Sequence, residues 1–149
     1  MTLGDCMRNV AIVGLDSIFV MNLSRQLASS LGFEYIDIDT TFERELLVSN
    51  NEPLFFMNEI WGKREGENIF DVAQKYDVVI SIRDDSFLSN EHYELFADSL
   101  TILIEREETD KIRNNIQNLI KKHCKMSFSQ ENFDFNKFLS IIRGVYDGQ

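Results

Sequence analysis

The chain has few cysteines and prolines, two and one in 149 residues. Cys6 and Cys124 are isolated, with no CxxC pair, so neither a disulfide framework nor a zinc site is indicated. No apolar run approaches the roughly 20 residues that cross a bilayer. The opening MTLGDCMRN lacks the basic-then-apolar pattern of a signal peptide. We therefore expect a cytoplasmic protein without a membrane partner.

Positive charge is also scarce. Lysine and arginine together number 15 against 25 aspartates and glutamates, which gives a formal net charge of -10. Affinity for a phosphate backbone depends on basic side chains that displace counterions, and this chain offers few of them. Nucleic acid is therefore not an expected partner.

What the chain has is enough apolar material for one core, with 44% hydrophobic and 11% aromatic residues, and we expect a single domain over residues 1–149. Nearly continuous apolar runs predict buried parallel strands at Val10 to Val13, Tyr35 to Ile38, Val78 to Ile82 and Leu100 to Ile104, with a short edge strand near Met126 to Phe128. Helical patterns fall between them, at about Phe19 to Leu31, Thr41 to Val48, Phe55 to Trp61, Glu67 to Lys75, Asp110 to His123 and Asn136 to Tyr146. This alternation predicts an α/β fold, a three-layer doubly wound parallel sheet of about five strands.

The first strand, Gly14 and the helix after it have the layout of a phosphate-binding loop. Such a loop reads GxxxxGK followed by Ser or Thr, because backbone N–H groups, a lysine and a hydroxyl hold the phosphates and Mg²⁺. Counted from Gly14, those last three places hold Phe19, Val20 and Met21. The Phe19 ring is expected to crowd the anion cavity, Val20 brings no charge, and the Met21 thioether is a poor ligand for a hard cation. The sequence thus predicts a degenerate loop and no cofactor.

The order of several motifs resembles the shikimate kinases, which are of the nucleoside-monophosphate-kinase type. The likeness covers about Asn9 to Glu105 and is carried by the Gly14 loop, Asp37-Ile38-Asp39, Glu59-Ile60-Trp61, Gly66-Glu67-Asn68-Ile69-Phe70 and the strand Val78 to Ile82. The resemblance implies a P-loop kinase-like fold. It also implies that Asp37 lies near Mg²⁺ and that Asp39 holds the acceptor hydroxyl.

At three other places the chain departs from the pattern of that family. Asp71 stands where the family has an arginine that grips the substrate carboxylate, and Arg83-Asp84-Asp85 stands where it has three glycines. No arginine-rich lid follows Arg106. The resemblance therefore implies a substrate pocket of which Asp39, Asp71, Arg83, Asp84 and Asp85 are remnants.

The ends of the predicted strands are expected to bring several carboxylates to one crevice that would repel ATP. These are Asp16, Asp37, Asp39, Asp71, Asp84 and Asp85, opposed by Arg83 and by Arg25, Lys63 or Arg64. Asp37 and Asp39 could be remnants of a metal site, or Asp39 could cap the helix that follows it. Asp84 and Asp85 are expected in a solvated turn, with an Mg²⁺ or cationic ligand as the alternative. No catalytic or metal residue is assigned from the sequence.

Two further expectations concern aromatic side chains. His92 has no serine or cysteine nucleophile near it in the sequence, so it is not expected to act as a general base. Trp61 and Phe70 are expected to pack in the core.

These patterns predict a catalytically degenerate shikimate kinase-like protein, a pseudoenzyme that works by binding a protein partner or a small ligand. One alternative is an active small-molecule kinase or residual nucleotide binder with a rearranged phosphate site, which would use Mg-ATP. A second is a degenerate receiver-like signalling domain, because Tyr76 to Asp84 is similar to the phosphoacceptor strand of response regulators.

Overall fold

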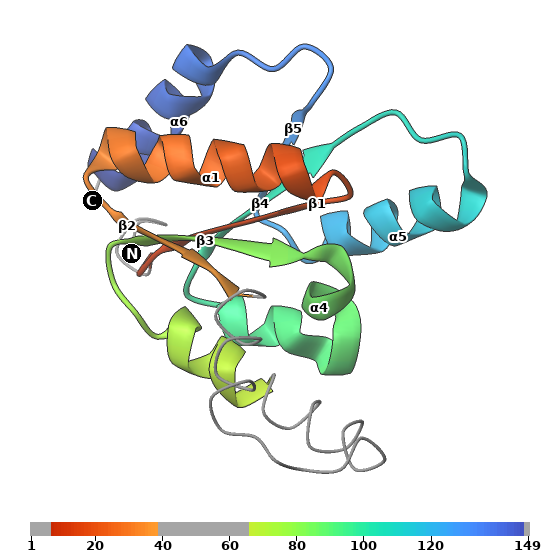
Figure 1. Cartoon of the computed structure of the whole chain (residues 1–149), viewed down its shortest axis with the longest axis horizontal. Helices are drawn as coiled ribbons and strands as arrows, with labels where there is room; N and C mark the ends of the chain where they lie inside the picture. The colour runs from red at the N-terminus through yellow and green to blue at the C-terminus, as the bar shows by residue number, and fades with distance from the viewer. Residues whose placement is uncertain (1–6, 39–65, 148–149) are drawn as a thin grey trace.

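The structure is a computed structural model that describes residues 7–38 and 66–147. The strands of these residues form one parallel sheet in the order β2-β3-β1-β4-β5 (Figure 1). Their bounds are β1 (Val10–Gly14), β2 (Glu34–Asp37), β3 (Val78–Arg83), β4 (Leu100–Glu105) and β5 (Met126–Ser129). The five expected strands are confirmed, and the short last strand lies at an edge of the sheet as predicted.

Helices cover both faces of this sheet (Figure 1). One face packs against α1 (Ser17–Leu31) and α6 (Phe135–Asp147). The other packs against a helix over 66–73, α4 (Asp84–Leu88), the 3-10 segment η3 (Ser89–Phe96) and α5 (Lys111–Lys122). The α/β, doubly wound architecture is therefore confirmed. The helices expected at 41–48 and 55–61 lie outside the described residues. Across 7–38 and 66–147, no helix combines the length and apolar character needed to span a bilayer.

The central strand β1 separates two cores. Val10 and Ile12 pack with the residues of α1 and α6, whereas Ala11 and Val13 pack with those of the opposite layer. Successive side chains of a strand point to opposite faces, so a strand covered on both sides must be apolar throughout. This explains the unbroken run of apolar residues that predicts the strand.

The connection from β1 to α1 is a short one, in which only Leu15 and Asp16 lie between the strand and the helix. Asp16 is extended (φ -93°, ψ 92°) and its side chain caps the helix, which therefore begins at Ser17 rather than near Phe19 as expected. At the other end Gly32 adopts the left-handed conformation (φ 72°), in agreement with the predicted helix stop.

Two expectations about side chains on the second layer are wrong. Asp84 and Asp85 do not form a turn but open α4, directly after Arg83. Acidic residues are favourable in the first turn of a helix because they face its positive dipole end, and Asp85 Oδ1 accepts a hydrogen bond from the Ser86 N–H (2.8 Å). Phe70 is 50% exposed rather than in the core, whereas Ile69 beside it is buried. Trp61 lies outside the described residues.

Candidate functional site

The N-terminus of α1 is occupied by the carboxylate of Asp16. Its Oδ1 accepts a hydrogen bond from the Phe19 backbone N–H (3.1 Å), and its Oδ2 accepts one from Nε2 of Gln130 (2.9 Å). Gln130 follows β5, so this second bond joins the β1–α1 turn to the β5–α6 connection. The positive end of a 15-residue helix thus faces an anion that belongs to the chain itself.

The surroundings of Asp16 favour its ionised form. The Phe19 N–H lowers the pKa of this carboxyl below its ordinary value of 3.8, and the Gln130 side chain and the positive charge of Arg106 act in the same direction. Each of these groups would stabilise any anion at this place. Asp16 is therefore a carboxylate held in an environment that suits negative charge.

The neighbouring β4–α5 connection, residues 106–110, is short and is fastened by side chains. Gln117 is buried, and it both accepts from the Arg106 N–H (3.0 Å) and donates to the Arg106 carbonyl (2.9 Å). Glu131 Oε1 accepts from the Glu107 N–H (2.6 Å), which lowers the pKa of Glu131. Glu108 pairs with Arg106 (2.9 Å) and has a lowered pKa, chiefly because it accepts the Asp110 N–H. These contacts hold the loops on either side of Asp16 in place.

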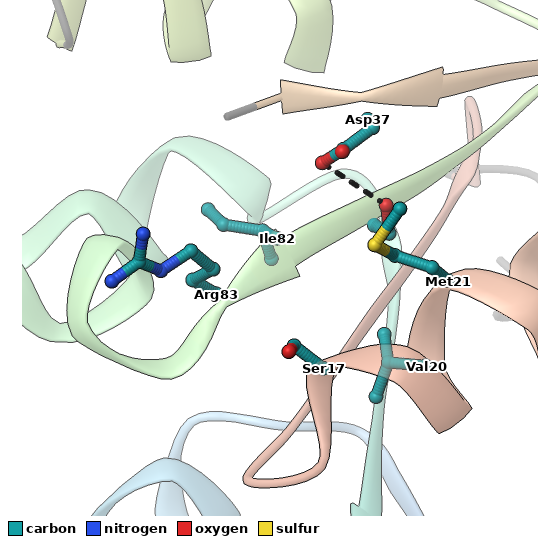
Figure 2. Close-up of a pocket in the computed structure, with 7 residues that line it drawn as sticks. Ser17, Val20, Met21, Asp37, Ile82 and Arg83 are labelled. Carbon is teal, nitrogen blue, oxygen red and sulfur yellow. Dashed lines mark hydrogen bonds between the residues drawn. The ribbon is translucent and has the colours of Figure 1, made fainter. Parts of the chain in front are cut away.

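A small cavity of about 100 Å³ lies between α1 and the carboxyl ends of β2 and β3 (Figure 2). α1 supplies one wall and the two strands supply the other. Its lining residues are Ser17, Val20, Met21, Asp37, Ser81, Ile82 and Arg83. Ligands of open parallel sheets bind outside the carboxyl ends of the strands, so this cavity is in the position expected for a binding site.

A chain of hydroxyl groups supports Asp37 at the floor of this cavity. The hydroxyls of Tyr35 and Ser81 are 2.8 Å apart, and Ser81 Oγ donates to Asp37 Oδ1 at 3.4 Å, the contact drawn in Figure 2. The Arg25 guanidinium lies over the Tyr35 ring, 5.5 Å from its centre. Burial raises the pKa of Tyr35, and the charge of Asp37 raises it further, so this phenol stays protonated and can donate.

Arg83 borders the cavity, and its guanidinium pairs with a residue of α4. Its guanidinium pairs with Asp85 Oδ2 at 3.0 Å, and both side chains are more than half exposed. In Figure 2 the side chain extends away from Asp37 and toward α4. The cationic head of Arg83 is thus matched by a residue of α4, and the stem of Arg83 borders the cavity.

The structure places the residues of the predicted loop in different surroundings. Val20 and Met21 line the cavity. Phe19 is not among its lining residues, and its ring packs edge-on against Phe133 (5.5 Å between ring centres). Gly14 is closely packed, since a Cβ there would lie 2.9 Å from the Ile104 carbonyl oxygen and 3.0 Å from a methyl group of Val20.

The described aspartates of the expected acidic crevice lie at different places. Among the described aspartates, Asp37 lines the cavity, whereas Asp71 is exposed on the 66–73 helix and Asp84 and Asp85 belong to α4. Asp16 faces Gln130 instead. Asp39, Lys63 and Arg64 lie outside the described residues. Within 7–38 and 66–147, no group of three or more His, Cys, Asp or Glu side chains is arranged to hold a metal ion.

The sequence did not point to Ser81 or Gln130. Ser81 had a detectable signal, because it is the one hydroxyl within the apolar strand Val78–Arg83, and a buried hydroxyl needs a partner. Gln130 had none, since its partner Asp16 is 114 positions away. His92 is buried with Nδ1 2.9 Å from the Ser86 carbonyl oxygen. This contact connects α4 to η3, away from the cavity-lining residues.

Comparison with known proteins gives likenesses in structure alone. No family model and no curated sequence matches the chain. The shikimate kinase of Acinetobacter baumannii, solved in complex with shikimate, has a TM-score of 0.69 at 15% identity, covering 95% of this chain and 94% of its own. The shikimate kinase of Aquifex aeolicus gives 0.69 at 17% identity, with 94% and 96% covered.

A third similar structure is the YorR protein of Bacillus subtilis in complex with phosphorylated GDP, with a TM-score of 0.62 at 11% identity, covering 93% of this chain and 95% of that one. Identities this low establish the fold only. The chain has the fold of the shikimate kinases and related P-loop kinases of the nucleoside-monophosphate-kinase type.

Proposed function

We propose that this chain is a catalytically degenerate, kinase-like protein that acts by binding a small ligand or a protein rather than by transferring a phosphoryl group. The observation that supports this proposal most directly is the Asp16 carboxylate at the N-terminus of α1, held by Phe19 and Gln130. In a phosphate-binding loop this end of the helix receives a phosphate. Here an internal anion uses the same donors.

The residues around α1 fit Mg-ATP poorly. At about 4 Å and an effective dielectric constant of about 20, two unit negative charges repel each other by about 4 kcal/mol. A phosphate at the N-terminus of α1 would carry the same sign of charge as the Asp16 carboxylate there. Val20 and Met21 bring neither the ammonium nor the hydroxyl that phosphoryl transfer uses to neutralise charge and to hold Mg²⁺. We therefore derive no phosphoryl-transfer step for this chain.

A binding role is compatible with the cavity at the ends of β2 and β3 and with the connection after β4. The cavity at the ends of β2 and β3 is formed, and Asp37 is positioned in it by Ser81. The connection after β4 is short, and the side chains of Gln117 and Glu131 fasten it.

The test is a thermal-shift titration of the whole chain with Mg-ATP, Mg-ADP, shikimate and Mg²⁺ alone. A ligand that binds only the folded state stabilises it, by about 2.7 kcal/mol at a ligand concentration of 100 times its Kd, and so raises the melting temperature. We expect no response to either nucleotide at about 1 mM. A concentration-dependent rise with Mg-ATP, reduced in a Ser17→Ala or Arg83→Ala variant, would overturn the proposal and favour the kinase alternative. A shikimate kinase in the same assay serves as the positive control.

A further inference from the structure

Helix α5 differs from the chain as a whole in the sign of its charge. Its sequence, KIRNNIQNLIKK, contains four lysines or arginines and no aspartate or glutamate, whereas the whole chain has a net charge of -10. Lys121 and Lys122 in the last turn are favourable, because they face the negative end of the helix dipole. Lys111 and Arg113 stand in the first turn, where cations are unfavourable. The stability of the helix therefore does not explain them.

The same helix exposes apolar side chains along one stripe. Ile112, Ile116 and Leu119 follow one another at spacings of four and three residues, which places them on one side of the helix. Ile112 is 73% exposed and Leu119 is 47% exposed, and Ile116 between them packs in part against the core. We call these three residues the α5 stripe. Their spacing is that of a helix surface that packs along a second helix.

Lys111 and Lys122 lie beside the α5 stripe, one toward each end of the helix. They are 11 residues apart, about three turns, so both project from the same side of α5. Both are exposed, and within the described part of the chain no ion pair involves either of them. Lys121, in contrast, pairs with Glu105 (3.1 Å). A partner that covers the α5 stripe therefore meets two exposed positive charges along one flank.

These features fit an acidic helix better than a larger anionic surface. A membrane or a nucleic acid presents negative charge over an area wider than one helix, and it would repel a chain with a net charge of -10. A second copy of this chain does not fit through the same helix, because two α5 helices would bring like charges together. A single acidic helix brings its negative charge to α5 alone.

We propose that the α5 stripe is a docking surface for an amphipathic helix of another protein, with apolar side chains against the stripe and acidic side chains beside Lys111 and Lys122. Helices that dock in this way use anchors at i, i+3, i+4 and i+7, which matches the spacing of the α5 stripe. This partner class rests on the proposed function, because a protein that works by binding requires a surface for its partner. The surface belongs to the layer on the opposite face of the sheet from α1 (Figure 1).

Two synthetic peptides separate charge from shape. Each has about 20 residues, above the length at which isolated helices are marginal in water, and leucines at i, i+4 and i+7. One carries glutamates along the flank where its twin carries lysines. They are titrated at constant ionic strength into the whole chain with ¹³C-labelled isoleucine δ1 methyl groups, and the Ile112 signal is assigned with Ile112→Val. We expect the acidic peptide to shift this signal at a concentration at least about tenfold lower than its basic twin.

A matched pair of variants tests the apolar part of the surface, with binding followed through the Ile116 signal. Ile112→Ser should weaken binding of the acidic peptide by about tenfold, because it removes an apolar anchor. Ile18→Ser should leave binding unchanged. Ile18 is equally exposed (72%) and is also the second residue of its helix, but that helix is α1.

A second matched pair tests the charges. Lys111→Glu/Lys122→Gln should weaken binding of the acidic peptide by about tenfold or more. Lys75→Glu/Lys137→Gln makes the same change of charge at two other exposed lysines and should leave binding unchanged. A glutamate at position 111 favours the first turn of α5, so weaker binding would not result from loss of the helix.

Equal or stronger binding of the basic twin would overturn the inference, and so would an Ile112 signal that responds to neither peptide or an equal effect of the control variants. A response of this signal to phosphatidylserine vesicles in place of the acidic peptide would also overturn it. Failure of the proposed function is measured separately, by the Mg-ATP titration. If neither the acidic peptide nor Mg-ATP binds, the partner class is wrong and the non-kinase role stands. If both bind, the docking surface stands and the non-kinase role is wrong.

Discussion

Gln130 Nε2 lies 2.9 Å from Asp16 Oδ2, and this hydrogen bond joins two connections that are 114 positions apart in the sequence. It closes the side of α1 at which a phosphate-binding loop would receive its anion. The other oxygen of the same carboxylate caps α1 through Phe19. The Asp16 side chain thus caps α1 and links the β1–α1 turn to the connection that follows the edge strand β5.

Acid should destabilise this chain partly through Asp16. Its folded pKa is lowered, so its contribution to stability is complete above its ordinary pKa of 3.8 and is lost as the pH falls toward the lower folded value. Asp16→Asn keeps a capping side chain but cannot be protonated, so the variant should show a smaller loss of stability between about pH 5 and about pH 2. Urea unfolding at several pH values measures this. If the free energy of unfolding falls equally with decreasing pH in both proteins, Asp16 has no such role. Some pH dependence should remain in the variant, because the pKa values of Glu108 and Glu131 are also lowered.

Gly14 should resist substitution for a reason unrelated to phosphate. A Cβ there would lie 2.9 Å from the Ile104 carbonyl oxygen, and a backbone atom of a central strand moves little. We expect Gly14→Ala to lower the free energy of unfolding by about 1–3 kcal/mol, as overpacking does. Adding Val20→Ala removes one of the two close contacts but leaves the other, and it creates a cavity of its own. Denaturant unfolding of the two single variants and the double variant gives the coupling free energy between the two positions. We expect the double variant to lose less stability than the sum of the two single variants. Unchanged stability of Gly14→Ala would contradict the close packing.

Val20→Lys alone should not create an ATP site. Val20 is 3% exposed, so a lysine there meets a desolvation cost, and Asp16 remains at the N-terminus of α1. Calorimetry with Mg-ATP should show no binding, together with a lower melting temperature. Asp16→Gly/Val20→Lys removes the competing carboxylate and is the matched comparison. ATP binding by the single variant would show that Asp16 does not block the site.

The Tyr35 and Ser81 hydroxyls should prove energetically coupled. They are 2.8 Å apart in a partly buried setting, where one neutral hydrogen bond contributes about 0.5–1.5 kcal/mol. Tyr35→Phe and Ser81→Ala should each destabilise the protein, and the double variant should lose less than the sum of the two. Strict additivity in a double-mutant cycle would exclude the bond.

Local patterns in the sequence determined most of the fold. The apolar runs of β1, β3 and β4 can be recognised in the sequence because strands covered on both faces are almost continuously apolar. Gly32 marks the end of α1 because glycine adopts its left-handed conformation without strain. The replacement of the motif's lysine by Val20 and of its hydroxyl residue by Met21 is likewise a property of the sequence alone.

Only the tertiary structure decided where the charges go. The sequence predicts Asp16 in an acidic crevice, whereas its role as an internal anion depends on Gln130, which the sheet brings beside it. The Phe19 ring packs edge-on against Phe133, a partner that spacing along the chain does not reveal. Asp84 and Asp85 were expected in a turn because the signals for turns and helix starts use the same residues. Spacing along a chain fixes local conformation, whereas the partners of a carboxylate or a ring are set by contacts between distant segments.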